Sequence, residues 1–279
     1  MPGRSPRPSS ARDGADRLKL HRRVLRADGR DYNVITLRPG AGARYSTNRY
    51  HETWHILSDV HGARLLGRLL WGLSYQRVPG TVVVIGPQHL DPNPFDAEPA
   101  DPIALVPSHL TTLTARASRS LRRLLAAPAT PDGTVRWHTW SLDPAVAELR
   151  AWRPGAAWPA WRPPADPYGV AIDRIGGLLT LRGSPAVLRE WAVDVARVGD
   201  HPHRGVDYTY LGSGDAIGCR SDGEVQVFGD YHQRVSVARV SRREVLAGVP
   251  AGASADDVNP RVWGHNKTVR ARRLPAVTA

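Results

Sequence analysis

The sequence predicts an α+β fold, with a mixed N-terminal region and a C-terminal region in which a helix packs on an antiparallel sheet. Two observations favour this class. Apolar residues in 50–76 recur every three to four positions, as in a helix, and a valine-rich strand follows at residues 81–85. After residue 167, one helix-start signal is followed by short β-branched or aromatic segments between Gly and Asp turns.

The N-terminal elements follow from local composition. Residues 32–37 predict a strand because they are rich in Tyr, Val, Ile and Thr, and a Pro-Gly pair follows. The helical segment at 50–76 contains three glycines, each costing about 1 kcal/mol relative to alanine, which favours a break near residues 58–62. Further along we expect a basic amphipathic helix at 108–127, a strand at 134–140 and a short helix at 144–152.

The C-terminal elements have clearer boundaries. Ser184 and Pro185 are the N-cap and first-position residues typical of a helix start, and Gly199 ends that helix. Residues 221–223 read Ser-Asp-Gly, a hairpin-turn signal. We expect strands at residues 178–181, 206–211, 215–219, 224–228 and 234–240.

Composition divides the chain into five parts. Residues 1–30 are rich in Pro, Ser, Gly and Arg and predict a disordered basic arm, with a short basic helix over 17–26. Residues 153–167 interleave prolines with Trp158 and Trp161, as in a linker or a strap packed on the body, and the tryptophans favour the strap. The other parts are an N-terminal α/β region at 31–152, a C-terminal α+β region at 168–260 and a basic tail at 261–279.

Positive charge concentrates at the two ends of the chain. The net charge is +12, of which residues 1–30 carry +6 and residues 261–279 carry +5, so residues 31–260 carry only +1. Arginine–phosphate contacts release counterions, so such ends are typical of polyanion binding, and a solvated tail that only aids solubility is the alternative. We therefore predict a nucleic acid or another polyanion as partner, held by Arg22, Arg23, Arg26, Arg270, Arg272 and Arg273.

Residues 51–55 read His-Glu-Thr-Trp-His. On a helix this spacing places both imidazoles on one face, and it resembles the motif of the zinc hydrolases, whose extended metzincin form adds a glycine and a third histidine. The resemblance implies zinc held by His51, His55 and His61, with Glu52 as general base, although Ser58 replaces the glycine. The alternative is a helix face that binds no metal.

Residues 56–62 read Ile-Leu-Ser-Asp-Val-His-Gly. This segment resembles the first metal-binding motif of the calcineurin-like metallophosphoesterases. The resemblance implies that Asp59 and His61 bind one of two metal ions that activate water. The sequence departs from that family at Pro87, which replaces an aspartate that bridges both metals and cannot itself ligate a metal.

A second group of histidines lies in the C-terminal half. His201 and His203 are separated by one residue, a spacing from which two imidazoles can bind a metal ion while carboxylates complete the shell. If strand ends bring them close to Asp230 and His232, the set would suit a metal-dependent hydrolase or nuclease. The alternative is that these are surface histidines or hydrogen-bonded core histidines.

Other features narrow the function classes. The single cysteine, Cys219, excludes an intrachain disulfide and a cysteine-based zinc site. No apolar run approaches the ~20 residues that span a bilayer, and residues 1–30 lack the apolar stretch of a secretory signal, so we expect a cytoplasmic protein without a membrane partner. The strong preference for arginine over lysine suggests a GC-rich bacterial genome. The leading hypothesis is a non-enzymatic protein that associates with DNA or with another partner through its arginine-rich ends. The alternatives are a metal-dependent hydrolase and a structural or assembly protein without a ligand.

Overall fold

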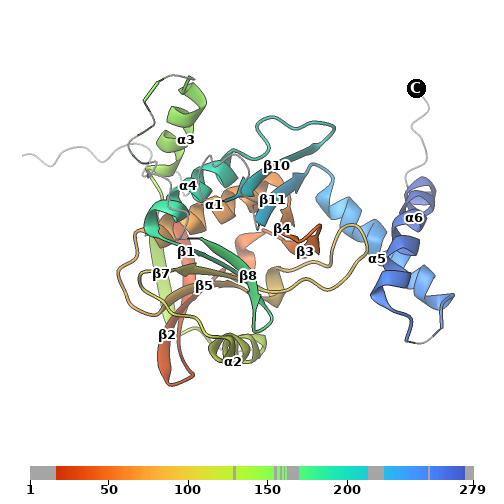
Figure 1. Ribbon diagram of the computed structural model, residues 1–279, viewed down its shortest axis with the longest axis horizontal. Coiled ribbons are helices and arrows are strands. Elements are labelled where there is room, and N and C mark those ends of the chain that lie inside the picture. Colours follow the sequence, from red (N-terminus) through yellow and green to blue (C-terminus); the bar gives the residue numbers. More distant parts are fainter. Residues whose placement is uncertain are drawn as a thin grey trace, which may run out of the picture.

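Two β-sheets organise the part of the chain that the computed structural model describes, namely residues 17–127, 130–153, 156–157, 159, 161, 170–212, 223–250 and 252–273. The larger sheet has seven strands in the order β7-β1-β2-β5-β6-β9-β8, and the smaller has four in the order β10-β11-β4-β3 (Figure 1). Together with the helices they form an α+β fold, which confirms the predicted class.

The strands of the larger sheet are β1 (Arg17–Ala27), β2 (Arg30–Thr36), β5 (Thr81–Ile85), β6 (Ile103–Pro107), β7 (Gly133–His138), β8 (Ala171–Ile175) and β9 (Leu178–Gly183). Those of the smaller sheet are β3 (Ser46–Tyr50), β4 (Thr53–Ser58), β10 (Val206–Leu211) and β11 (Gly223–Phe228). The helices are α1 (Val60–Ser74), α2 (Ala115–Ala126), α3 (Leu142–Ala151), α4 (Pro185–Arg197), α5 (Tyr231–Ala247) and α6 (Ala255–Arg273), with short 3-10 turns at Pro39–Ala41 and Pro87–His89.

The larger sheet separates two hydrophobic cores, because apolar side chains alternate between its faces. Val83 and Ile85 of β5 belong to the core that includes α1 and α4, whereas Val82 and Val84 belong to the core that includes α2. Figure 1 shows α1 and α4 on one side of the sheet and α2 on the other. Because α2 alone covers its face, the end of that face formed by β7 and the start of β1 keeps exposed side chains.

Helices α1 and α4 approach each other closely at a glycine. A Cβ atom on Gly67 would lie 2.8 Å from the backbone oxygen of Ala192 on α4. One turn further along α1, a Cβ atom on Gly72 would lie 2.5 Å from the ring of Trp137. The glycines that lower the intrinsic helix propensity of this segment therefore permit its packing.

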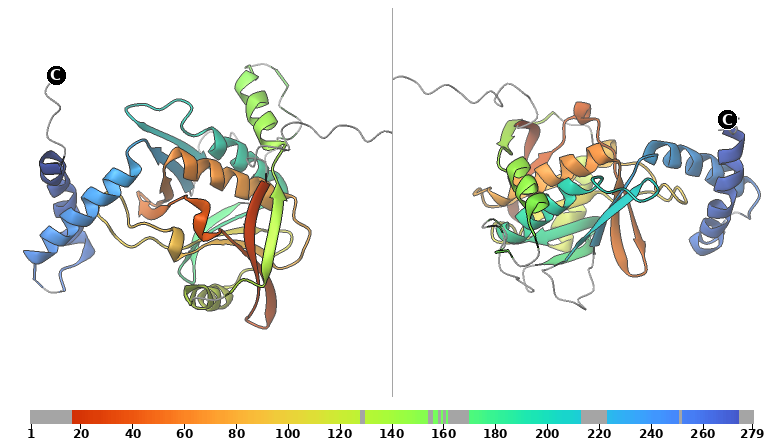
Figure 2. Two further views of the ribbon diagram at one scale, coloured as in Figure 1. Left: turned by 180° about the vertical axis from the view of Figure 1, so that it is seen from behind. Right: turned by 90° about the horizontal axis from the view of Figure 1, so that it is seen from above.

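Helices α5 and α6 form a hairpin that projects from the sheets (Figure 2). Part of its contact with the body runs through the loop after β5, where Arg239 pairs with the buried Asp91 at 2.9 Å and Arg242 pairs with Glu98 at 2.5 Å. At the start of α5, Tyr231 packs against Leu57 and Phe228 and hydrogen-bonds Ser46. From α6, the side-chain amide of Asn266 donates to the backbone oxygen of Phe95 at 2.7 Å. None of the described helices is both long and apolar enough to cross a bilayer.

Three predicted elements are wrong. Residues 17–26, expected as a basic helix within a disordered arm, form strand β1, because Leu18 and Leu20 alternate with charged residues and fill the core at period two. Residues 50–58, expected as helix, form the end of β3 and all of β4, so the helix begins only at residue 60. Residues 234–240, expected as a strand, lie within α5.

Both sheets combine strands from the two regions expected at 31–152 and 168–260. Strands β8 and β9 extend the sheet of the N-terminal strands, and β10 and β11 pair with β4, so each sheet mixes both halves. The expected tail at 261–279 continues α6 as far as residue 273.

The structure confirms the helix that Ser184 caps and five of the predicted strands, those near residues 32–37, 81–85, 178–181, 206–211 and 224–228. Four predicted features lie wholly or mostly outside the described residues. They are residues 1–16, the strand at 215–219 with Cys219, most of the hairpin signal at 221–223, and most of the 153–167 segment, including Trp158. Trp161 is described: it packs against the first core, and its indole N–H donates to Glu148 at 3.0 Å.

Candidate nucleic-acid interface

The edge of the larger sheet carries a row of cations. Strand β7 pairs with β1 in antiparallel register, which sets Arg17 opposite His138, Lys19 opposite Arg136 and His21 opposite Thr134. Residues directly opposite in an antiparallel pair point to the same face. We call this face the basic ribbon, formed by Arg17, Lys19, His21 and Arg23 of β1 with Arg136 and His138 of β7.

The core explains why the ribbon points outward. Leu18 and Leu20 alternate with the cations of β1, and Trp137 lies between Arg136 and His138; all three apolar side chains are buried in the core that α1 and α4 share. A rotation of either strand would expose them, so core burial fixes the direction of the charged side chains.

The ribbon has little internal charge compensation. The side chains of Arg17, Lys19 and Arg136 are exposed and make no hydrogen bond or ion pair with any residue of the described part. Arg23 donates only to the backbone oxygen of Leu124, at 3.4 Å. Asp132, just before β7, accepts from the backbone N–H of Val24 at 2.6 Å.

Helix α2 extends the basic surface. Arg116 pairs with Asp28 in the turn after β1, at 3.4 Å, so this side of the helix faces β1. Arg123 lies seven residues later and therefore on the same side. Between the ribbon and the C-terminal end of α2 lies a cleft of about 530 Å³, lined by His21, Arg23, Thr36, Gln88 and Leu125 among others.

An exposed aromatic residue lies just beyond the end of β7. Trp140 is 55% exposed, and its ring centre lies 4.8 Å from that of His138, with the planes tilted by 59°. A tryptophan held beside a row of cations is a suitable surface for stacking an unpaired base.

The arginines predicted at the two ends have different environments. Of the N-terminal three, Arg23 lies on the ribbon, Arg22 points to the opposite face of β1, and Arg26 pairs with Asp31 at 3.3 Å. The C-terminal three contribute to packing of α6 on α5: Arg270 contacts Asp230 at 3.5 Å, Arg272 contacts Glu244 at 2.7 Å, and Arg273 donates to Ser236 at 2.7 Å. The pKa of Glu244 is lowered by the hydrogen bonds from His265 and Arg272.

The His-Glu-Thr-Trp-His segment is not helical. His51 and Glu52 form the turn between β3 and β4 with left-handed backbone angles, φ 47° and 65°, so Glu52 is not on a helix beside the two histidines. His55 is buried on β4, its Nδ1 2.9 Å from Asn48 Oδ1 and its Nε2 3.4 Å from Glu224 Oε2. His61 lies on α1, with Nε2 3.1 Å from the backbone oxygen of Ala41.

The phosphoesterase-like segment has the strand and helix that the resemblance implies, but its polar groups have other contacts. Asp59 follows β4 and caps α1 by accepting from the backbone N–H of Gly62 at 2.8 Å. Its other oxygen lies 3.2 Å from Nε2 of His232. Pro87 starts a 3-10 turn.

The contacts of the other predicted metal ligands do not bring them together around one metal ion. Asp230 binds Arg234 at 2.5 Å, the backbone of His203 pairs with that of Val206, and the backbone N–H of His201 donates to Asp207 at 3.3 Å. Within the described ranges, no three His, Cys, Asp or Glu side chains are placed to hold one metal ion.

Sequence reasoning missed the residues that form most of the ribbon, namely Arg17, Lys19, Arg136, His138 and Trp140. The available signal was the alternation of basic and apolar residues in 17–20 and 135–138, which is typical of a strand with one buried face. The pairing of these two segments, which sets Lys19 opposite Arg136 across 117 residues of sequence, became visible only in the fold.

No protein-family model, curated protein or solved structure matches this chain. The fold and the surface therefore define its class by themselves: an α+β protein whose mixed sheet ends in an exposed basic ribbon.

Proposed function

We propose that this protein binds nucleic acid through the basic ribbon, by contacts to phosphates rather than by reading base edges. The observation that carries the proposal is the set of exposed, unpaired cations Arg17, Lys19 and Arg136 on one uncovered sheet face. Phosphates are the ligands that such a row of cations favours, because each contact releases condensed counterions.

The surroundings support a nucleic acid over a small anion. The cleft beside Arg23 and the cations of α2 continue the basic surface past the ribbon. Trp140 at the other end offers a stacking surface that a simple anion would not use. A strand of nucleic acid has both the extended charge and the bases that this combination fits, and a single-stranded region is best able to use the tryptophan.

The test is a salt titration of binding. Fluorescence anisotropy with labelled single-stranded and duplex oligonucleotides would compare the full chain with the triple variant Arg17→Ala, Lys19→Ala, Arg136→Ala. Each lost phosphate contact lowers the slope of log affinity against log salt by about 0.7–0.9, so the triple variant should lose roughly 2–3 from the slope.

A matched control removes the same charge elsewhere. Arg243, Arg261 and Lys267 are exposed on α5 and α6 and have no ion pair among the described residues, so their alanine substitutions also remove three positive charges. The proposal requires that this control retain the wild-type slope. Equal losses in both triple variants, or no binding by the wild type, would overturn it.

Deletion of residues 1–30 is not a clean test, because it removes β1 and with it the pairing of β2 and β7. A chain that begins at residue 17 keeps β1 and loses the three arginines of residues 1–16. Binding by this shorter chain would assign the activity to the ribbon, and its loss would assign the activity to the first 16 residues.

A further inference from the structure

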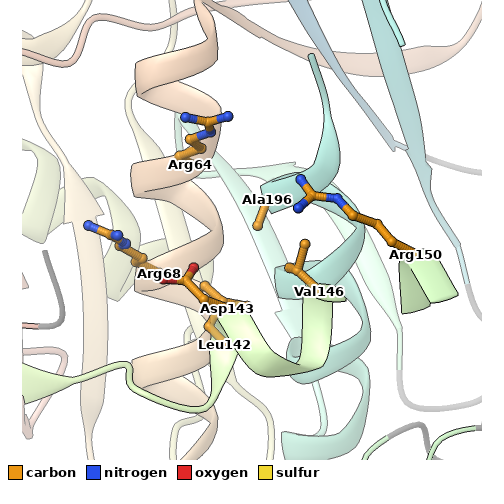
Figure 3. Close-up of a pocket in the computed structure, with 7 residues that line it drawn as sticks. All are labelled: Arg64, Arg68, Leu142, Asp143, Val146, Arg150 and Ala196. Carbon is orange, nitrogen blue, oxygen red and sulfur yellow. The ribbon is translucent and has the colours of Figure 1, made fainter. Parts of the chain in front are cut away.

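A second arginine-lined cavity lies away from the ribbon, between α1, α3 and α4. It has a volume of about 250 Å³ and is lined by Arg64 and Arg68 of α1, by Ala196 of α4, and by four residues of α3: Leu142, Asp143, Val146 and Arg150. Figure 3 shows the guanidinium groups of Arg64 and Arg150 on opposite sides of Ala196, whereas Arg68 and Asp143 lie further down in this view and the guanidinium group of Arg68 points away from that of Arg150.

The two facing arginines differ in their partners. Asp200 holds Arg150 through Nε at 2.8 Å and Nη2 at 2.7 Å, which fixes the side chain and leaves Nη1 without a partner among the described residues. The side chain of Arg64 makes no hydrogen bond or ion pair within the described part of the chain. One guanidinium is thus pre-positioned by a carboxylate and the other is available.

The charge balance of the cavity favours a negatively charged ligand. Three arginines and one carboxylate, that of Asp143, line the cavity, and Asp200 adds a second carboxylate through its pair with Arg150. Figure 3 shows that Asp143 does not lie between Arg64 and Arg150. Arg64 and Arg68 are also one helical turn apart, an arrangement of like charges that is unfavourable without an anion. Guanidinium groups bind planar or tetrahedral oxyanions with paired N–H donors.

The floor of the cavity favours a ligand that has an apolar part beside its charged group. Leu142 and Val146 are buried, and Ala196 lies between the two arginines, so the surface under the guanidinium groups is apolar. We propose that this cavity binds a small organic oxyanion, a phosphate monoester or a carboxylate, whose charged group bridges Arg64 and Arg150 and whose apolar body rests on Val146 and Ala196. This site shares no residue with the ribbon and does not depend on nucleic-acid binding.

Calorimetric titration of the full chain with four probes tests the proposal: phenyl phosphate, benzoate, inorganic phosphate and benzyl alcohol. Phenyl phosphate or benzoate should bind about tenfold or more tightly than inorganic phosphate, because the ring buries apolar area. The stronger of the two identifies the oxyanion class. Benzyl alcohol, which lacks the charge, should show no saturable binding.

Charge-matched variants locate the site. Arg64→Gln should weaken binding of the best probe by about tenfold or more, since a charged hydrogen bond is lost. Arg77→Gln, a change at an exposed arginine beyond the end of α1, should leave it unchanged. The ribbon triple variant should also bind the probe normally, which separates this site from the proposed function.

Three results would overturn the proposal: no saturable binding of either organic anion, equal loss in Arg64→Gln and Arg77→Gln, or binding of benzyl alcohol as strong as that of phenyl phosphate. Because Arg64 is exposed, its substitution leaves the core intact, and a thermal melt of each variant confirms that the compared proteins are folded.

Discussion

Lys19 on β1 and Arg136 on β7 lie directly opposite each other in the antiparallel register, on an exposed sheet face, with no acidic partner for either among the described residues. Like charges in this position destabilise a strand pair. The pair therefore opposes the stability of the sheet edge in the free protein, and a bound polyanion would relieve this repulsion.

Removing one member of this pair should stabilise the fold while it weakens binding. Lys19→Thr should raise the free energy of unfolding by about 0.2–1 kcal/mol, because it removes the repulsion and adds a residue that strands favour. Urea denaturation measures the first effect and the salt titration the second. A loss of stability in Lys19→Thr would show that Lys19 has a structural role instead.

Two glycine positions should respond to alanine in opposite directions. Gly67→Ala should destabilise the protein by about 1–3 kcal/mol, since the new Cβ must push α1 from Ala192 and this strain exceeds the gain in helix propensity. Gly264→Ala on α6 meets no atom within 4 Å and should stabilise the protein by up to about 1 kcal/mol. Denaturant midpoints of both variants give the comparison, and a stabilised Gly67→Ala would contradict the close helix contact.

The elements predicted well from sequence are those whose local signals agree with their burial. Residues 81–85 are all β-branched, with Thr81 followed by four apolar residues, and all are buried in β5. Ser184 and Pro185 start α4 as their positions predict. The segment 17–26 differs from these, because its charge indicates an exposed arm and the alternation of Leu18 and Leu20 becomes decisive only beside a neighbouring strand.

The candidate site was less accessible to sequence reasoning than the fold class. Arg23 was predicted as a nucleic-acid contact and lies on the ribbon, but Arg272 is equally basic in sequence and is paired with Glu244 across the helix hairpin. Nothing local distinguishes the two arginines. The difference depends on which distant segment packs against each, and that is a property of the tertiary structure.

The contact of α6 with α5 should weaken in acid. The pKa of Glu244 is lowered by hydrogen bonds from His265 and Arg272, so the folded hairpin favours the ionised carboxylate. Such a group contributes stability above its unfolded pKa, near 4.3, and loses that contribution as pH falls through its lower folded value. The protection of the α6 amides against hydrogen exchange, relative to their intrinsic rates at each pH, should therefore fall between about pH 5 and pH 3.

The variant Glu244→Gln isolates this effect. At neutral pH the α6 amides of this variant should exchange faster than those of the wild type, because the ion pairs are lost. Their protection relative to the intrinsic exchange rate should also depend less on pH. If Glu244→Gln kept the full acid sensitivity of the wild type, another carboxylate would be responsible.

His55 and His51 should respond to substitution as structural residues rather than as a metal pair. His55→Ala removes one of the partners of the buried Glu224 and should cost about 2 kcal/mol, while His51→Gly should change stability by less than about 0.5 kcal/mol because glycine tolerates the left-handed turn. The double variant His55→Ala, Glu224→Ala should cost less than the sum of its single changes, since the two side chains interact directly. Melting temperatures measured with and without a chelator complete the test. If His51 and His55 shared a zinc ion, the chelator and both single variants would destabilise the protein together; the structure instead predicts that only the His55 variant does so.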